Sequence, residues 1–356
     1  MLGTDEIGKA LAAGRAERRK FQNLDYVRLR YPHKGAERGS VLAKGSFFPG
    51  FPHIMRIFTL EKGLERNISS GSVYAEEKID GYNLRCVFLG GEIYALSRGG
   101  IVDAFSTEKL RELVPRAIFR SNVMLCGEMI GNTPYTRPSS DFDVKYYVFD
   151  IYDLEEGEYL PPEARYELLR RHGLSFAPSF GKFHVKKDQK KLNALALNVN
   201  KSNKEGIVFK SEDRTEAVKY VNPNADIDDV AQTVKAMFDM PSGQYNQRIL
   251  RSSIFIREHG LDQAAYGAKL GAAFYKGMAK GLEMLERDGS IYDEFEILVK
   301  DKSVWDELKS HMSREVKLET VFEKEEAGKT RIRFRKVYAR STKKLKEFLN
   351  GKGITD

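Results

Sequence analysis

The sequence predicts an α+β protein in which mainly antiparallel sheets carry flanking helices. Three observations predict this class. Residues 71–100 and 121–152 are rich in strand-like apolar runs, with a helical segment between them. Residues 205–221 form two more strand-like runs joined by a polar turn. After Pro223 the spacing of the apolar residues becomes helical, before a small mixed tail.

The length and the charge suggest several domains and a polyanionic partner. A chain of 356 residues exceeds one typical domain, so about two to four units are expected. With 59 Lys and Arg against 51 Asp and Glu, the formal charge is +8 and the pI is near 9.1. This balance favours nucleic acid as a partner. The alternative is that the charged residues, 31% of the chain, only solvate the surface, as in hyperstable proteins.

Cysteine and histidine usage predicts neither a disulfide framework nor a dedicated zinc site. Cys86 and Cys126 both lie in apolar strand-like stretches, which favours small core residues. The six histidines are scattered, without HxxxH or HExxH spacing. No apolar run is long enough for a secretory signal or a membrane span, so the sequence predicts a soluble, cytoplasmic protein.

The N-terminal segment is basic and interleaved with aromatic residues. Residues 15–38 include Phe21, Tyr26 and Tyr31 among many arginines. Such a segment can follow a phosphate backbone while its rings stack on bases, but the charged flank of an ordinary subdomain has the same composition. In residues 40–60, glycine and proline separate short apolar runs, which predicts strands and turns.

The central elements follow from helix and strand signals. The runs "SNVMLCGEMIG" at 121–131 and "VKYYVFDIYDL" at 144–154 predict two buried strands. Residues 106–119 have helical spacing, with Ser106 or Thr107 as the N-cap. The polar turn within 205–221 predicts that its two strands are neighbours.

Further helices are predicted at 161–173, 226–260 and 262–289. The last is dense in alanine and glycine, and small residues at helical spacing let two helices approach closely. It is a predicted helix–helix interface, within one chain or between two. The tail predicts a helix near Trp305, an alternating strand at 330–339 and a basic helix at 341–351.

The stretch "YAEEKIDGYNLR" at 74–85 sets a lysine two residues before an Asp-Gly pair, between two strand-like runs. The simplest interpretation is a β-hairpin, because Asp-Gly is a strong signal for a tight turn. The alternative is that Lys78 is a nucleophile displayed between the strands. One K-x-D-G match does not decide, since such a short motif also occurs by chance.

Five motifs that follow Lys78 carry a family resemblance. They are "SRGG" at 97–100, "LCGEMIG" at 125–131, "YYVFDI" at 146–151, "EGIVFK" at 205–210 and "AVKYV" at 217–221. Over residues 71–221 this series resembles the covalent nucleotidyltransferases, the superfamily of ATP-dependent DNA ligases, RNA ligases and messenger-RNA capping enzymes. Within it, the chain looks like the archaeal homodimeric ATP-dependent RNA ligases.

The resemblance implies the nucleotidyltransferase (ligase adenylation) fold and a division into four parts. These are an N-terminal module at 1–70, the nucleotidyltransferase domain at 71–223, a helical dimerisation domain at 224–290 and a small α+β C-terminal domain at 291–356. The helical character after Pro223 departs from the OB-fold barrel that follows the last motif in DNA ligases and capping enzymes. This departure favours an RNA ligase.

The resemblance also implies a role for each motif residue. Lys78 is the lysine that receives AMP, and Phe149 is the ring that stacks on the base. The implied catalytic residues are Lys78, Arg98, Glu128, Glu205, Lys210 and Lys219, of which Glu128 and Glu205 hold the metal. The implied nucleotide-binding residues are Glu77, Ile79, Asp80, Gly81, Gly99 and Phe149. The implied cofactors are ATP and Mg²⁺ or Mn²⁺.

These residue types suit one chemistry. A free lysine has a pKa near 10.4, so only about one in a thousand is the neutral amine at pH 7, and cationic neighbours disfavour the charged form. The same cations neutralise a triphosphate, and hard carboxylates hold Mg²⁺. The resemblance implies that AMP passes from ATP to Lys78 and then to a 5′-phosphate, which a 3′-hydroxyl attacks. The result is a sealed phosphodiester.

Some alternatives remain at this stage. Phe149 in an apolar strand is commonly plain core, and Glu128 and Glu205 could be surface carboxylates, although an unpaired charge beside glycine in an apolar strand is costly. Ala217 stands where many relatives have the first of two lysines in the last motif, and Lys210 is predicted to compensate.

The implied partner is RNA, single-stranded with 5′-phosphate and 3′-hydroxyl ends, and the implied assembly is a homodimer through residues 224–290. The rival functions are a DNA ligase, a GTP-using guanylyltransferase and, from another class, an RNA-binding protein without catalysis. The series from Lys78 to Lys219 argues against the last, because binding alone needs no such lysine.

Overall fold

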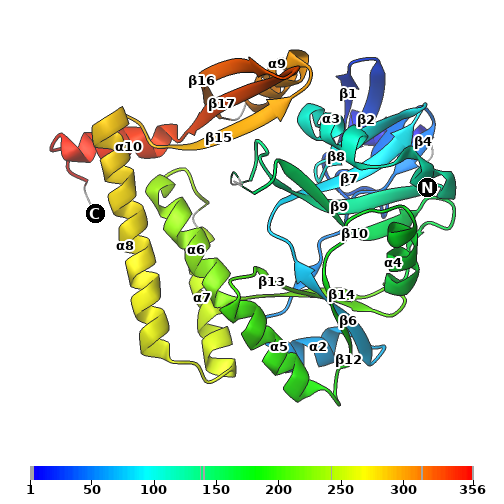
Figure 1. The fold of residues 1–356 in the computed structure, drawn as a ribbon, viewed down its shortest axis with the longest axis horizontal. Helices are drawn as coiled ribbons and strands as arrows, with labels where there is room; N and C mark the ends of the chain where they lie inside the picture. Colours follow the sequence, from blue (N-terminus) through cyan, green and yellow to red (C-terminus); the bar gives the residue numbers. More distant parts are fainter. Residues whose placement is uncertain (1–3, 137, 139–140, 242, 314–315, 355–356) are drawn as a thin grey trace.

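The computed structural model describes residues 4–136, 138, 141–241, 243–313 and 316–354. Within them the chain forms four sheets, and every strand pair is antiparallel except β5 with β14. The predicted α+β class is therefore confirmed. Figure 1 shows the sheets on one side and the long helices α6 to α8 on the other, with the C-terminal sheet reaching across between them.

Two five-stranded sheets form the centre of the molecule. The first has the order β11-β10-β9-β7-β8 and the second β12-β6-β13-β14-β5. The strands of the first sheet are β7 (Tyr82–Leu89), β8 (Glu92–Ser97), β9 (Val123–Gly131), β10 (Val144–Asp153) and β11 (Glu158–Tyr159). Those of the second are β5 (Met55–Arg56), β6 (Ser72–Lys78), β12 (Ser179–His184), β13 (Gly206–Ser211) and β14 (Ala217–Val221).

The segment from Lys78 to Gly81 connects these two sheets, so the hairpin interpretation is wrong. β6 ends at Lys78 in one sheet, and β7 begins at Tyr82 in the other. The pair β13 and β14 is the predicted antiparallel hairpin, and β9 pairs with β10 as two adjacent buried strands. Lys78 therefore lies where the chain crosses from one sheet to the other.

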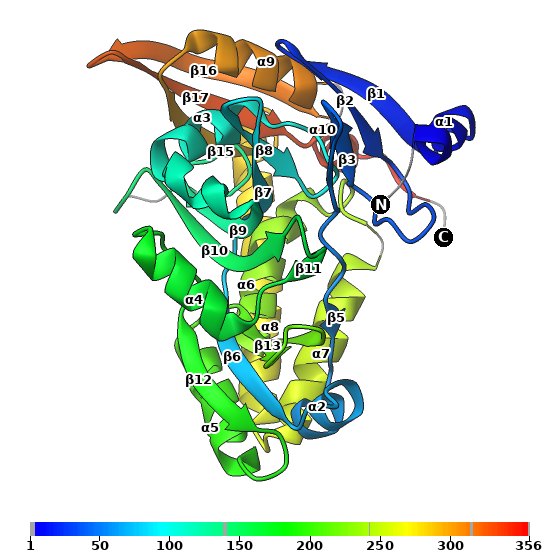
Figure 2. The same cartoon turned by 90° about the vertical axis from the view of Figure 1, so that its right-hand side faces the viewer.

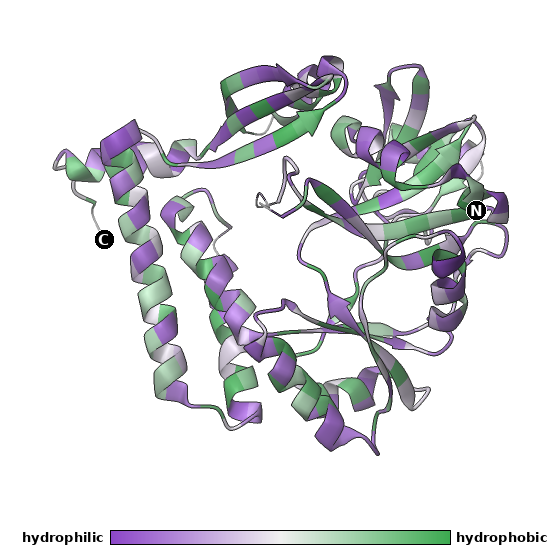
Figure 3. Ribbon diagram, in the orientation of Figure 1, coloured by the Kyte–Doolittle hydropathy of each residue, from purple (hydrophilic) through white to green (hydrophobic). Residues whose placement is uncertain are grey.

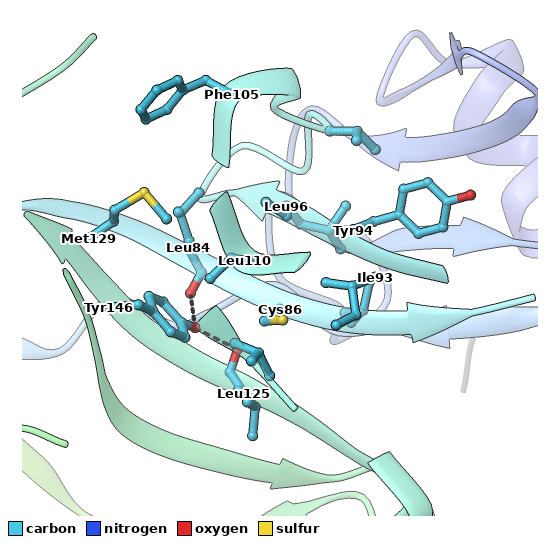
Figure 4. Close-up of a cluster of buried hydrophobic side chains, with 14 of the residues drawn as sticks. Leu84, Cys86, Ile93, Tyr94, Leu96, Phe105, Leu110, Leu125, Met129 and Tyr146 are labelled. Atoms are coloured by element: carbon cyan, nitrogen blue, oxygen red, sulfur yellow. Dashed lines mark hydrogen bonds between the residues drawn. The ribbon is translucent and has the colours of Figure 1, made fainter. Parts of the chain in front are cut away.

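Each central sheet has a core of its own. The first core cluster contains Leu84, Cys86, Leu125, Met129 and Tyr146, all buried (Figure 4). The hydroxyl of Tyr146 donates to the carbonyls of Leu84 and Leu125, both at 3.3 Å, which satisfies this buried polar group. Cys86 and Cys126 are free thiols in this core, as expected from the sequence.

The helices around the sheets differ in part from prediction. α3 (Ala104–Leu113) is capped by Asp103, whose carboxylate accepts the amide of Ser106 at 2.7 Å, so the predicted cap at 106 or 107 is wrong. A 3₁₀ helix, η1 (Arg116–Ser121), follows after the proline break. The remaining helices here are α2 (Leu60–Asn67), α4 (Pro162–Arg171) and α5 (Gln189–Lys201); α4 was predicted and the other two were not.

The N-terminal segment folds into α1 (Thr4–Ala12) and a sheet of order β1-β2-β3-β4. Its strands are β1 (Ala16–Phe21), β2 (Leu24–Leu29), β3 (Val41–Ala43) and β4 (Ser46–Phe48). Phe21 and Tyr26 are buried in the core, and the Tyr26 hydroxyl accepts the amide of Val102. Neither of these two rings is accessible for stacking on a base. Of the three aromatic residues singled out in the sequence, Tyr31 is the exposed one.

After residue 222 the chain is helical, as predicted. The elements are α6 (Pro223–Thr233), the 3₁₀ helix η2 (Val234–Ala236), α7 (Gln244–Glu258) and α8 (Gln263–Asp288). The one helix predicted over 226–260 is in fact interrupted between α6 and α7. Figure 2, turned by 90°, shows α7 and α8 running behind the second central sheet.

The C-terminal part forms a three-stranded sheet of order β15-β17-β16 with two helices. Its elements are β15 (Tyr292–Val299), α9 (Lys302–Met312), β16 (Lys317–Glu326), β17 (Lys329–Val337) and α10 (Ala339–Leu349). Figure 3 shows polar and apolar residues alternating along these strands. Trp305 and Phe334 from this part share a core cluster with the first central sheet, so the two pack together. Among the described helices, none combines the length and the apolarity needed to cross a membrane.

Candidate active site

A pocket of about 680 Å³, counted out to its open mouth, lies between the two central sheets. The first sheet contributes Asn83, Glu128 and Phe149, the strands β6, β13 and β14 of the second sheet contribute several more residues, and the rest come from connecting segments. The predicted site residues that line it are Glu77, Lys78, Ile79, Arg98, Glu128, Phe149, Lys210 and Lys219. Residues from the Lys78 motif and from all five motifs that follow it thus meet in one pocket.

Lys78 is the last residue of β6 and its ammonium reaches Glu205. Lys78 pairs with Gly206 across β6 and β13, which sets Glu205 directly beside it. The Lys78 Nζ donates to Glu205 Oε2, and both side chains are 21% exposed. A strand end therefore presents an amine that is held by one carboxylate and is still open to the pocket.

Gly81 brings the crossing segment close to β9. A Cβ atom at Gly81 would lie 2.6 Å from the carbonyl oxygen of Met129 and 2.9 Å from Glu128 Cγ. Any other residue would therefore push the segment after Lys78 away from the strand that carries Glu128. Asp80 is exposed and lies with Glu205 in a neighbouring pocket. The carbonyl oxygen of Gly99 accepts a hydrogen bond from Arg28 at 2.7 Å.

The carboxylates of the site repel each other. Burial raises the pKa of the Glu128 carboxyl to about 7, and the charges of Glu205 and Asp80 add to the rise, although Lys78 opposes it. Burial and Asp80 likewise raise the pKa of Glu205, against the effect of Lys78. A divalent cation between Glu128 and Glu205 would relieve this repulsion.

Two carboxylates make an incomplete metal site. Within the described residues, no group of three or more His, Cys, Asp and Glu side chains could hold a metal ion. Glu128 and Glu205 fit an ion that takes only two protein ligands and completes its shell with water and phosphate oxygens, which is how Mg²⁺ is commonly bound.

Cations line the opposite part of the pocket. Burial lowers the pKa of Lys219 to about 8, and the charges of Arg56 and Lys78 lower it further. Arg98 donates from Nη2 to His53 Nδ1 at 3.1 Å, and burial also lowers the pKa of Arg98. The crowding of positive charge fits a pocket that receives a polyanion.

Lys210 has partners of its own below the pocket. Its ammonium lies 2.7 Å from Glu76 Oε2 and 3.1 Å from Asp150 Oδ1, and it also donates to the carbonyl oxygen of Phe149. The Lys210 side chain is only 1% exposed. This geometry does not support the prediction that Lys210 binds phosphate in place of a lysine at position 217. It fits a residue that positions the Phe149 backbone.

Phe149 is half-buried in the pocket wall, and a bulge sets it there. The register of β10 against β9 shifts between Val148 and Asp150, so Phe149 has no partner residue on β9. Its ring makes an edge contact with Phe51, at 5.2 Å between centroids. The Lys210 ammonium lies 5.7 Å from the centroid of the ring, and the ring lines the pocket, which fits the predicted stacking role.

Several lining residues were missed by the sequence reasoning. They are Phe51, Ile54, Glu76, Asn83, Ala177 and Val208. Glu76 could have been found, because it is a carboxylate inside an apolar strand, the signal that singled out Glu128. Phe51 and Ile54 lie in an irregular segment with no periodic pattern, so nothing in the sequence pointed to them.

Comparisons with known proteins bear on the family. Residues 71–222 match the RNA ligase family, and residues 232–352 match the family described as the ligase Pab1020 C-terminal region. The chain is thus similar to RNA ligases over residues 71–222. The matched ligase domain contains every motif residue from Lys78 to Lys219. This confirms the family resemblance.

Relatives of the whole chain support the same assignment. Two structures described as archaeal ATP-dependent RNA ligase, forms 1 and 2, are 25% identical with TM-scores of 0.89 and 0.88, covering 99% of this chain and 97% of theirs. A structure from Aquifex aeolicus, provisionally described as an ATP-dependent DNA ligase, is 29% identical with a TM-score of 0.94, covering 99% and 100%. An uncharacterized protein of Methanocaldococcus jannaschii is 26% identical over 373 residues, 98% of this chain and 94% of the relative. The nucleotidyltransferase-type ligase fold thus extends over all parts of the chain.

Glu128 gives the ligase domain a pH-dependent stability that can be measured. A carboxyl whose pKa is about 7 when folded and about 4.4 when unfolded stabilises the fold below pH 4.4, and this contribution is lost as the pH rises through 7. We expect Glu128→Gln to stabilise the protein by about 2 to 3 kcal/mol at pH 8 and by almost nothing at pH 4.5. Thermal melts of both proteins at each pH measure the difference.

The exposed Glu65 on α2 supplies a matched control for this experiment. Glu65→Gln should change the melting temperature equally little at both pH values. An equal shift for Glu128→Gln at pH 4.5 and pH 8 would contradict the raised pKa of Glu128.

Proposed function

We propose that this protein is an ATP-dependent RNA ligase that works through a covalent lysyl-AMP on Lys78. The observation that carries the proposal is the position of the Lys78 amine, paired with Glu205 and open to a pocket lined by Arg98 and Lys219. The match of residues 71–222 to the RNA ligase family and the likeness to archaeal ATP-dependent RNA ligases support it.

The proposed reaction has three steps. The neutral amine of Lys78 attacks the α-phosphorus of ATP; the N–P bond forms, the bond to the β-phosphate oxygen breaks, and pyrophosphate leaves. The 5′-phosphate of RNA then attacks the same phosphorus and releases Lys78, which gives an adenylylated RNA end. A 3′-hydroxyl finally attacks the 5′-phosphate, loses its proton and expels AMP.

The residues of the pocket have distinct parts in this scheme. Glu205 accepts a hydrogen bond from the resting ammonium and is placed to take its proton. Arg98 and Lys219 neutralise phosphate oxygens as negative charge moves onto the leaving group. Phe149 stacks on the base, and Glu77 and Ile79 line the same pocket. Gly81 keeps the segment that contains Asp80 close to β9. Mg²⁺ or Mn²⁺, held by Glu128 and Glu205, would supply further neutralisation of the phosphates.

Covalent labelling tests the function directly. The protein is incubated separately with α-labelled ATP and α-labelled GTP, and the label that survives denaturation is measured. We expect label from ATP. Label from GTP alone would assign a guanylyltransferase instead, and no label from either would leave a protein that only binds RNA.

The choice of nucleic acid needs a sealing assay. The family supports RNA with a 5′-phosphate and a 3′-hydroxyl as the substrate, whereas the relative from Aquifex aeolicus bears a DNA ligase description. Joining or circularisation of single-stranded RNA, compared with single-stranded DNA and nicked duplexes, separates these substrates.

We also infer a homodimer through residues 224–290, the predicted dimerisation domain between residues 71–223 and 291–356. A Cβ atom added at Gly267 or Gly271 on α8 would contact no other atom, so the helix backbone is open to solvent there. Tyr275 on the same helix is 77% exposed. A helix with bare backbone and an exposed ring suits close contact with a second copy. Sedimentation velocity at micromolar concentration should give the mass of two chains.

A further inference from the structure

The last motif has alanine where many relatives have a first lysine, and an arginine from the N-terminal part of the chain lies beside its remaining lysine. Ala217 occupies the place of the first lysine, and Lys210 is engaged below the pocket. The two-residue strand β5 lies beside β14, parallel to it, with Arg56 in register with Lys219. The amide of Ile57 donates to the Lys219 carbonyl at 3.0 Å and holds this register.

The register sets the two cations side by side. Glu76 pairs with Val208, Val208 with Lys219, and Lys219 with Arg56. Side chains of directly paired residues project from the same face of a sheet. The Arg56 side chain therefore leaves the sheet on the same face as Lys219, and it lines the adjoining pocket with Asp80 and Glu205.

Arg56 lies near the carboxylates of Asp226 and Glu205, whose charges oppose the lowering of its pKa by burial, but it pairs with neither of them. It is half-buried, its Nε has no hydrogen-bond partner, and no carboxylate among the described residues forms an ion pair with it. Two other arginines of the adjoining pocket are already paired, Arg248 with Asp229 at 2.8 Å and Arg251 with Asp226. A half-buried guanidinium without a partner is costly, and an anionic ligand would remove that cost.

The order of strands gives the order of the three cations across the second central sheet. Lys78 on β6, Lys219 on β14 and Arg56 on β5 follow one another across the sheet order β6-β13-β14-β5. Three strand spacings and an offset of two residues along β6 separate the outer two, about 16 Å between Cα atoms. With the α-phosphate at Lys78, the β- and γ-phosphates extend toward Lys219 and Arg56.

We propose that Arg56 is a phosphate-binding residue that takes the place of the missing lysine and holds the pyrophosphate end of ATP together with Lys219. This inference rests on the proposed function, since it requires ATP at Lys78. Arg56 could bind the 5′-phosphate of RNA by the same chemistry. The experiment must therefore distinguish the outer phosphates of ATP from the RNA 5′-phosphate as its ligand.

The affinities for ATP and AMP test the role of Arg56. They are measured by calorimetry in a Lys78→Met background, in which ATP is not consumed. We expect Arg56→Ala to weaken ATP binding at least tenfold and AMP binding less than threefold, because AMP lacks the two outer phosphates. Arg56→Lys, which keeps the charge, should stay within about threefold of the parent for both nucleotides.

The exposed Arg66 on α2 provides the control, and Arg66→Ala should change neither affinity. Equal losses for ATP and AMP, or no loss for either, would overturn the role of Arg56. Unchanged ATP and AMP affinities with a lost preference for 5′-phosphorylated over 5′-hydroxyl RNA would assign the subsite to RNA instead. Covalent labelling of the wild-type protein remains a separate test, so its failure would count against the ligase mechanism and not against Arg56 alone.

Discussion

Lys78→Ala is expected to reduce covalent capture of AMP by at least about 1,000-fold, to below detection, because alanine has no group that can attack phosphorus. The change removes one end of the Lys78–Glu205 ion pair at a partly exposed position. We therefore expect the fold to persist and RNA binding to stay within a few-fold of wild type. The measurement is label retained from α-labelled ATP after denaturation, with RNA binding followed in parallel.

Two further measurements make this result specific to the amine. Lys62→Ala removes an exposed lysine from α2 and should leave labelling unchanged. RNA that is already adenylylated bypasses the lysyl-AMP stage, so Lys78→Ala should still seal it. Full labelling of Lys78→Ala by ATP would place the nucleophile elsewhere and end the proposed mechanism.

The sequence located the site because its residues stand next to local signals. Glu128 and Glu205 are carboxylates beside glycine in apolar strands, and Lys78 precedes an Asp-Gly pair. Such positions are costly for a charge unless a ligand or partner uses it, so they stand out without a structure. Only the family resemblance implied that they meet in one pocket. β9 belongs to the first central sheet, whereas β6 and β13 are neighbours in the second sheet but lie far apart in the sequence.

Other parts could not be predicted because they depend on long-range contacts. β5 has two residues, too few for a periodic pattern, and only its pairing with β14 gives Arg56 a position in the site. The Asp-Gly pair looked like a hairpin because local turn signals cannot tell whether two flanking strands share a sheet. The N-cap of α3 was misplaced by a few residues, which is common where Asp, Ser and Thr lie close together.

The buried ionic partners of Lys210 beneath the pocket were also not predicted, although they are among its least exposed charged groups. Asp150 is fully buried and receives two hydrogen bonds from Arg214, at 2.8 and 2.7 Å. Lys210 lies 3.1 Å and Arg165 3.4 Å from the same carboxylate. Burial alone would raise the pKa of Asp150, but Arg214 and Lys210 hold it below its usual range, so the carboxylate stays charged.

Asp150→Asn is therefore expected to destabilise the ligase domain by about 3 to 5 kcal/mol, since it keeps the shape but leaves three buried cations with one remaining carboxylate, Glu76. For a domain of this size the loss corresponds to a fall in melting temperature of roughly 10 °C or more. Lys210 and Arg165 also donate to the carbonyl of Phe149, so nucleotide affinity should fall in the molecules that remain folded.

Asp25 on β2, which is exposed, gives the matched control, and Asp25→Asn should change the melting temperature by no more than about 1 to 2 °C. Calorimetry of both variants at pH 7 measures the difference. If Asp150→Asn has the same melting temperature as the wild type, the stability of the domain does not depend on the Asp150 charge. Phe149 must then be positioned by the bulge in β10 alone. If stability falls but the affinity for AMP is unchanged, the cluster supports the fold without shaping the nucleotide pocket. Loss of both would show that the ion pairs beneath Phe149 set the position of the ring as well as the stability of the domain.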